Sequence, residues 1–219
     1  IETVYEEYNK TFSTGAIEKS YPFWVEFDEP RALEKMKQTF TPAQSEVKFS
    51  IILPTYNTDP IYLKECIDSV LQQTHKNWEL CIADDASSNA ETINTLKSYV
   101  QKHANIKLNL LSENGHISKS SNAALSMVSS DYVLLLDHDD TLPAHTLSFF
   151  AKAITDNTKA KVLYGDEDKI DEQGNRHQPH FKSSWNPDLL LSQNYICHPV
   201  VYKTSVLKKI GGFRVGVEG

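Results

Sequence analysis

Short apolar runs alternate along the chain with longer stretches in which apolar residues recur at helical spacing. Residues 49–53 form the first apolar run and predict a strand, and a helix opens at Pro60 with Leu63 and Ile67 on its apolar face. The same reasoning predicts strands at 78–83, 106–111, 132–136, 161–164 and 198–202, and helices at 90–102, 118–128, after Pro143 and at 205–210. This alternation is typical of βαβ units and predicts an α/β fold with a mostly parallel sheet flanked by helices.

The first part of the chain departs from this alternation. Residues 1–47 are rich in aromatic side chains and predict an N-terminal helical extension, with a helix from Pro30 and a linker at 41–45. A loosely ordered arm is the alternative for this region. Residues 48–219 are expected to form the main α/β domain.

Composition is that of an ordinary globular protein. Hydrophobic residues make up 40% and charged residues 23%, and the net charge of -7 argues against general nucleic-acid binding, which uses a basic face. No apolar run approaches the ~20 residues that span a bilayer, and no signal peptide is visible. Cys66, Cys81 and Cys197 are too widely spaced for a disulfide framework or a zinc site, so we expect reduced thiols and a cytoplasmic location. The chain starts with Ile, which indicates a fragment of a longer protein.

Three carboxylates, Asp137, Asp139 and Asp140, follow directly on the apolar run 132–136. Carboxylates at this density repel one another unless a cation lies between them. Their oxygen atoms suit Mg²⁺ or Mn²⁺, and such a metal commonly also binds phosphate oxygens. Asp139 is the candidate for direct metal binding, and Asp137 for ribose hydroxyls or metal-bound water. The alternative is an acidic turn in which Asp140 or Thr141 caps the next helix.

Polar loops follow each of the first four predicted strands. In chain order they contain PTYN (54–57), DDAS (84–87), ENGH (113–116) and DHDD (137–140). Ligands bind outside the carboxyl ends of the strands in an open α/β sheet, so we expect these loops to gather at one edge and form one site.

Several of these side chains suit a nucleotide. Thr55 and Tyr56 offer a hydroxyl group and an aromatic face to a ribose and a base. Asp84 or Asp85 can accept a hydrogen bond from an imide N–H, such as that of uracil, or can cap the next helix. Gly115 permits close approach of the backbone to a ligand.

These loops, together with NGHISKSSN at 114–122 and YGDEDKID at 164–171, resemble the inverting family 2 glycosyltransferases of GT-A fold. The resemblance covers residues 48–219. Its last part, from residue 185 onward, is similar to bacterial enzymes that build O-antigen, capsule and related surface polysaccharides. The resemblance implies a nucleotide-diphosphate-sugar donor and Mn²⁺ or Mg²⁺ at the DxD motif. Among the nucleotides, the hydrogen bond that Asp84 or Asp85 can accept from uracil favours UDP.

The resemblance also implies a role for each matching position. The nucleotide-binding set is Pro54, Thr55, Tyr56, Asn57, Asp84, Asp85, Gly115, Asn122, Asp137 and His138. Asp139 is the implied metal ligand. The implied general base is an acidic residue on a later loop, where relatives have Glu-Gly followed by an Asp. Since the sequence stops at Glu218-Gly219, Glu218 is either the upstream neighbour of that base or a substitute for it.

The acceptor side is expected to use residues after 165. Asp166 or Glu167 is expected to meet a sugar hydroxyl, with a solvated acidic turn as the alternative. Trp185 is a candidate for stacking on a sugar face, and a packed tryptophan is the alternative. His198 is a candidate third metal ligand or acceptor contact, and a structural histidine is the alternative.

The implied reaction is a single displacement. A base takes a proton from an acceptor hydroxyl, which attacks the anomeric carbon opposite the leaving diphosphate. We expect a glycan or lipid-linked glycan as acceptor, and peripheral association with a membrane assembly complex at the inner face of the membrane.

Two alternatives come from other functional classes. The run from 134 to 142 also matches the first motif of haloacid-dehalogenase-like phosphatases, with Asp137 as nucleophile and Asp139 as acid–base. That hypothesis leaves the PTYN and DDAS loops unexplained and places the next acidic motif, at Asp166, too close along the chain. The second alternative is a nucleotide-sugar-binding module without turnover. The absence of GxGxxG and GxxxxGK[ST] motifs argues against dinucleotide oxidoreductases and P-loop enzymes.

Overall fold

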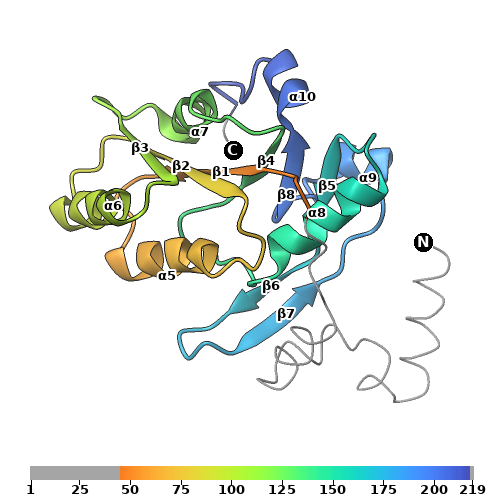
Figure 1. Cartoon of the computed structure of the whole chain (residues 1–219), viewed down its shortest axis with the longest axis horizontal. Helices are drawn as coiled ribbons and strands as arrows, with labels where there is room; N and C mark the ends of the chain where they lie inside the picture. The colour runs from red at the N-terminus through yellow and green to blue at the C-terminus, as the bar shows by residue number, and fades with distance from the viewer. Residues whose placement is uncertain (1–44, 218–219) are drawn as a thin grey trace. The chain divides into compact units, whose positions relative to one another are not determined.

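A computed structural model describes residues 45–217 of the chain (Figure 1). The described residues fall into two compact units. The larger unit holds residues 45–164 and 198–217, and the smaller holds residues 165–197. The predicted N-terminal extension lies almost wholly outside the described residues, as does Glu218.

A six-stranded sheet forms the centre of the larger unit, with strand order β3-β2-β1-β4-β8-β5. The strands are β1 (Phe49–Thr55), β2 (Trp78–Asp84), β3 (Ile106–Leu110), β4 (Tyr132–Leu135), β5 (Val162–Tyr164) and β8 (Val200–Lys203). The first four run parallel to one another, whereas β8 runs antiparallel to both β4 and β5. The predicted α/β fold with a mostly parallel sheet is therefore confirmed.

Helices cover both faces of this sheet (Figure 1). They are α5 (Pro60–Leu71), α6 (Ala90–Lys102), α7 (His116–Ser126), α8 (Thr146–Asp156) and α10 (Thr204–Lys209). Successive residues of a strand point to opposite faces. Phe49 and Ile51 of β1 accordingly pack in the core formed with α5, α6 and α8, while Ile52 packs in the core formed with α7 and α10. Both faces are apolar, as parallel strands covered on two sides require.

Several element bounds differ slightly from the predicted ones. Helix α7 begins at His116 rather than at 118, directly after Gly115, and its first residue has a positive φ of 64°. Strand β8 begins at Val200 rather than at 198, because Pro199 has no N–H to contribute to a ladder. None of the helices within residues 45–217 has the length and apolar character needed to cross a membrane.

The smaller unit contains a hairpin that the sequence did not predict. Strands β6 (Glu167–Ile170) and β7 (Arg176–His180) pair antiparallel and are followed by helix α9 (Pro187–Ser192). Asp171 closes the turn by accepting hydrogen bonds from the backbone N–H groups of Gln173 and Asn175. The strands are charged and largely exposed, so they carry no apolar alternation that would reveal them.

Glu79, at the start of β2, joins four segments at the edge of the sheet where the parallel strands begin. Its buried carboxylate accepts hydrogen bonds from Ser50 Oγ at 2.5 Å and from the backbone N–H of Ser129 at 2.7 Å, and lies 3.3 Å from Lys48 Nζ and 3.0 Å from Lys107 Nζ. Burial opposes its ionisation, but the hydrogen bonds outweigh burial and hold the pKa of Glu79 at about 2. The charged carboxylate therefore stabilises the fold above its unfolded pKa.

We expect Glu79→Gln to lower the free energy of unfolding by about 3 kcal/mol at pH 7, because it removes the charged partner of two lysines. Stability of the wild-type protein should fall as the pH drops from the unfolded pKa of 4.5 toward 2, and the variant should lose less over that range. Urea unfolding at several pH values measures both effects, with the exposed Glu65→Gln as the control. Equal stability of the two variants would contradict this account.

Candidate functional site

The carboxyl ends of β1, β2 and β4 bring the predicted loops together. Asp85 donates its backbone N–H to Thr55 O at 2.8 Å, which joins the first two loops. The third loop starts where Leu111 N donates to Asp84 O at 2.9 Å, and the fourth where Leu136 N donates to Ile52 O at 3.2 Å. The four loops therefore lie at one edge of the sheet, as the strand order requires.

The two neighbouring aspartates of the second loop have different surroundings. Asp84 is buried, and both of its carboxylate oxygens are used within the loops: Oδ2 accepts from Thr55 Oγ1 at 3.0 Å and Ser87 Oγ at 2.6 Å, and Oδ1 from Ser87 N at 2.9 Å. Asp85 is 3% exposed, and its Oδ1 accepts from Gly115 N at 2.8 Å. Among the described residues no hydrogen bond reaches Asp85 Oδ2. Asp84 thus organises the loop, while Asp85 uses only one of its two carboxylate oxygens within the described residues.

Asn57 connects the first loop to the second. Its side-chain Oδ1 accepts from the backbone N–H groups of Ser88 at 2.9 Å and Asn89 at 3.1 Å, and its own backbone N–H donates to Ser87 Oγ at 2.7 Å. Asn tolerates the left-handed backbone found here, with φ 47°. Asn57 therefore supports the loops from within, whereas the neighbouring Tyr56 is 48% exposed and accessible to a ligand.

Strand pairing places a histidine against the fourth loop, residues 137–140, which we call the acidic loop. Leu135 pairs with Val200, and because β8 runs antiparallel to β4, His198 lies opposite Asp137 beyond the end of the ladder. His198 Nε2 lies 3.5 Å from Asp137 Oδ2, and its Nδ1 lies 3.4 Å from Asp140 Oδ2. The predicted metal ligand Asp139 has a 64% exposed side chain and lies 3.9 Å from His138 Nδ1. Asp140 joins this group, although the sequence analysis named it only as one of three clustered carboxylates or as a helix cap and chose Asp139 as the metal ligand.

The donor atoms of Asp137, Asp140 and His198 fit a divalent cation. One ligand atom from each lies within 4.8 Å of the others, and within residues 45–217 this is the one such group of three acidic, cysteine or histidine side chains. Two carboxylate oxygens suit Mg²⁺ and Mn²⁺ alike, and an imidazole nitrogen is a common ligand of transition metals such as Mn²⁺. The residues present therefore fit the metal that the DxD motif implies.

A small cavity of about 200 Å³ adjoins this group. Pro54, Leu136 and Phe213 contribute to its apolar lining, and Asp137 and His198 contribute polar atoms. Sites that enclose a whole small ligand measure ~300–1,000 Å³, so this cavity has room for only part of a nucleotide sugar.

Comparison with known proteins identifies the family. Residues 50–211 match the family described as Glycosyl transferase family 2. The chain belongs to glycosyl transferase family 2. It is therefore a glycosyltransferase domain, and the phosphatase alternative is set aside.

Known relatives of this family 2 domain are longer proteins. The O-antigen biosynthesis protein RfbC of Myxococcus xanthus is 31% identical over 199 residues, which covers 91% of this chain and 16% of RfbC. The uncharacterized protein y4gI of Sinorhizobium fredii is 42% identical over 170 residues, covering 78% of this chain and 19% of y4gI. The chain thus spans less than a fifth of these two curated relatives.

A solved structure of the same fold is that of S. aureus TarS, residues 1-349, in complex with UDP-GlcNAc. It is 28% identical, with a TM-score of 0.62, and covers 76% of this chain and 48% of the TarS chain. The likeness confirms the predicted GT-A fold.

Asn122, predicted to bind the nucleotide, contacts the end of the described family 2 domain. Its side-chain amide makes two hydrogen bonds to the backbone of Phe213: Nδ2 donates to the carbonyl oxygen at 2.8 Å, and Oδ1 accepts from the N–H at 2.9 Å. Ser118, one helical turn earlier, donates to Arg214 O at 3.2 Å. Helix α7 thereby holds the segment that leads to Glu218.

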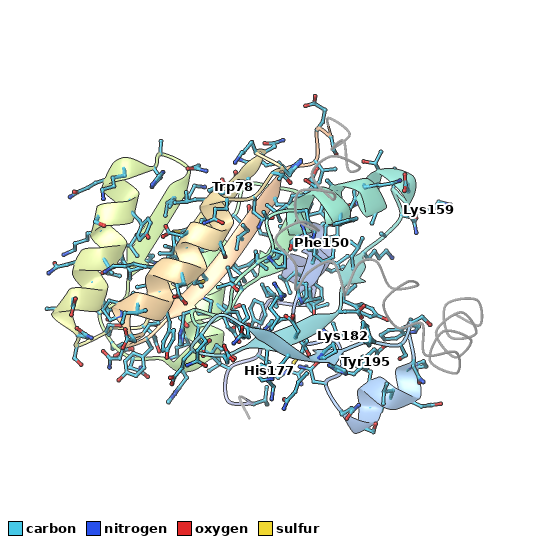
Figure 2. All side chains as sticks on the ribbon, turned by 90° about the horizontal axis from the view of Figure 1, so that it is seen from below. Trp78, Phe150, Lys159, His177, Lys182 and Tyr195 are labelled. Atoms are coloured by element: carbon cyan, nitrogen blue, oxygen red, sulfur yellow. The ribbon has the colours of Figure 1, made fainter. Side chains whose placement is uncertain are left out.

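The predicted acceptor residues Asp166, Glu167 and Trp185 lie in the smaller unit, to which Lys182, labelled in Figure 2, also belongs. Asp166 accepts from Lys182 N at 2.8 Å, and Glu167 contacts His180 Nδ1 at 2.9 Å and Lys182 Nζ at 3.3 Å. The side chain of Lys182 is buried, and its Nζ also donates to Ile196 O at 2.7 Å. Trp185 is 61% exposed, which leaves its ring accessible to a sugar.

We expect Gly212→Ala to destabilise the domain more than Gly211→Ala does, by about 2 kcal/mol. Both glycines have a positive φ, so both substitutions strain the backbone. A Cβ atom at 212 would in addition overlap Asn122 Oδ1, whereas one at 211 would meet open space. Urea unfolding of the two variants measures the difference. Equal losses of stability would mean that the Asn122 side chain moves away from the new Cβ atom at no energetic cost.

Proposed function

We propose that this family 2 domain transfers a sugar from a nucleotide-diphosphate donor, most favourably a UDP-sugar, to a glycan, in a metal-dependent reaction that inverts the anomeric centre. The observation that carries the proposal is the placement, on one sheet edge, of an open carboxylate oxygen on Asp85 and of the Asp137–Asp140–His198 group. A nucleotide-sugar site needs a group that recognises the nucleotide base and a group that holds the metal with the diphosphate.

Asp85 is our candidate for recognition of the base. Uracil presents an imide N–H, which a carboxylate oxygen accepts, whereas cytosine presents a bare ring nitrogen that a carboxylate repels. Asp85 is buried and held by Gly115 N, so its second oxygen has a fixed direction. The TarS complex with UDP-GlcNAc supports the same donor class. Pro54, Thr55 and Tyr56 remain our candidates for contact with the nucleoside.

The acidic loop and His198 are our candidates for holding Mn²⁺ or Mg²⁺. The bound metal would neutralise charge that develops on the leaving diphosphate. Asp137 and Asp140 supply carboxylate oxygens and His198 an imidazole nitrogen within reach of one another. Asp139 stays a prediction as a metal ligand. If the metal binds to Asp139, its substitution should weaken metal binding most; if the metal binds to Asp140, substitution of Asp140 should.

The remaining steps concern the acceptor. A general base removes a proton from the acceptor hydroxyl, which attacks the anomeric carbon from the side opposite the diphosphate, without a covalent enzyme intermediate. Its assignment to Glu218 or an acidic residue after it stays a prediction. Trp185 is our candidate for stacking on an acceptor sugar. A glycan or lipid-linked glycan acceptor, and action at the inner face of a membrane, are likewise part of the proposal.

We expect the wild-type domain to bind UDP about tenfold more tightly than CDP, since only uracil has a ring imide N–H to donate to Asp85 and cytosine has an acceptor nitrogen at that position. Asp85→Asn should weaken UDP binding about tenfold and reduce the preference for UDP, because an amide offers an N–H to cytosine. Calorimetric titration measures both affinities. Asp131→Asn removes an exposed carboxylate that lies directly before β4, at the opposite edge of the sheet, and should change neither. Equal affinities for UDP and CDP in the wild-type protein would contradict the role of Asp85.

We expect Asp140→Asn to weaken Mn²⁺ binding more than Asp139→Asn does, because Asp140 lies beside His198 and Asp139 points to solvent. A loss of about tenfold or more for Asp140→Asn would fit removal of a charged ligand. Electron paramagnetic resonance of free Mn²⁺ during titration measures the affinities. The reverse order would place the metal on Asp139, as the sequence motif suggested.

A further inference from the structure

Helix α5 carries a buried polar stripe beside the acidic loop. Cys66 and Ser69 lie on the helix, and Gln73 follows its C-cap residue, Gln72. Their spacing of three and four residues places them on one side of the helix. Cys66 and Gln73 are wholly buried, and Ser69 is nearly so. Polar side chains at core positions normally have specific partners, so their contacts indicate what the stripe does.

The first two residues of the stripe hold the acidic loop at its two ends. Cys66 Sγ donates to Asp137 O at 3.4 Å, and the same carbonyl accepts from Asp140 N at 3.2 Å, which closes the turn that carries the carboxylates. Ser69 Oγ accepts from Leu142 N at 3.0 Å and donates to Cys66 O at 2.7 Å. The segment between Asp137 and Leu142 is thus attached to one helix at both ends.

Gln73 extends the attachment to the start of α8. Its Nε2 donates to Pro143 O at 2.9 Å, and its Oε1 accepts from Leu147 N at 3.1 Å. The backbone N–H of the next residue, Thr74, donates to Ala144 O at 2.7 Å. The backbone from the acidic turn to the first turn of α8 is therefore hydrogen-bonded to α5 and to the residues that follow α5.

The attachment matters because the loop carries like charges. In the proposed metal site Asp137 and Asp140 each contact one ring nitrogen of His198. His198 lies directly before β8, the strand that pairs antiparallel with β4. Mutual repulsion of the carboxylates favours other loop conformations, and hydrogen bonds to the loop backbone oppose that tendency. The Cys66 thiol supplies one of these hydrogen bonds from a wholly buried position.

We propose that Cys66, Ser69 and Gln73 are positioning residues that hold the acidic loop in its metal-binding geometry and so raise the affinity of the domain for Mn²⁺. This inference rests on the proposed metal site. It adds that part of the metal affinity resides in a helix that supplies no ligand, as is common for groups that orient metal ligands.

The test compares Mn²⁺ affinity with stability in matched variants. Cys66→Ala and Ser69→Ala should each weaken Mn²⁺ binding about tenfold. Cys81→Ala is the matched control: Cys81 is also wholly buried, but it lies in β2 and packs with residues of α7 on the other face of the sheet. That variant should lose stability without losing Mn²⁺ affinity. Cys66→Ser, which restores a donor, should recover affinity toward the wild-type value.

The outcomes separate this inference from the function on which it rests. Wild-type Mn²⁺ affinity in both Cys66→Ala and Ser69→Ala would overturn the positioning role while leaving the metal site in place. A loss of affinity in Cys81→Ala as large as in Cys66→Ala would also overturn it, because the effect would then follow stability alone. Absence of Mn²⁺ binding by the wild-type domain would overturn the metal site itself and this inference with it. Gln73→Leu is a third variant for the same measurement. If this variant does not fold, Cys66→Ala and Ser69→Ala decide the question.

Discussion

The repulsion between carboxylates at the end of β4 is the constraint around which the candidate site is arranged. Asp137, Asp139 and Asp140 follow closely on β4, and their like charges favour loop conformations that separate them. Contacts from two directions oppose that tendency. Antiparallel strand β8 delivers His198 between two of the carboxylates, and α5 holds the loop backbone from the core side. A divalent cation would complete this arrangement.

The second loop shows a different use of paired carboxylates. Asp84 has both oxygens occupied by Thr55 and Ser87, so it contributes to loop geometry. Its neighbour Asp85 is held through one oxygen, and in our proposal the other oxygen accepts a hydrogen bond from the base. Adjacent residues of one type would then divide structural support and recognition between them, because successive side chains at the end of a strand point in opposite directions.

The sequence predicted the fold well because its strands and helices carry strong apolar periodicity. It did not predict the β6–β7 hairpin, whose strands are charged and held by pairs such as Arg176–Asp168. It also gave no sign of Gln73, whose importance depends on loop backbone atoms seventy residues away. Asn57 and Asn122 were predicted to bind the nucleotide, and in the structure their amides bind backbone groups of neighbouring segments. A motif identifies which residues gather, and only three-dimensional contacts show which oxygens remain for a ligand.

The most direct test of the metal-dependent donor site is anomalous diffraction from crystals of the domain grown with UDP and Mn²⁺. The account predicts a manganese peak between His198 and the carboxylates of the acidic loop, with the diphosphate at the metal and the uracil ring against Asp85. A peak elsewhere, or ordered UDP at this sheet edge without any manganese peak, would contradict it.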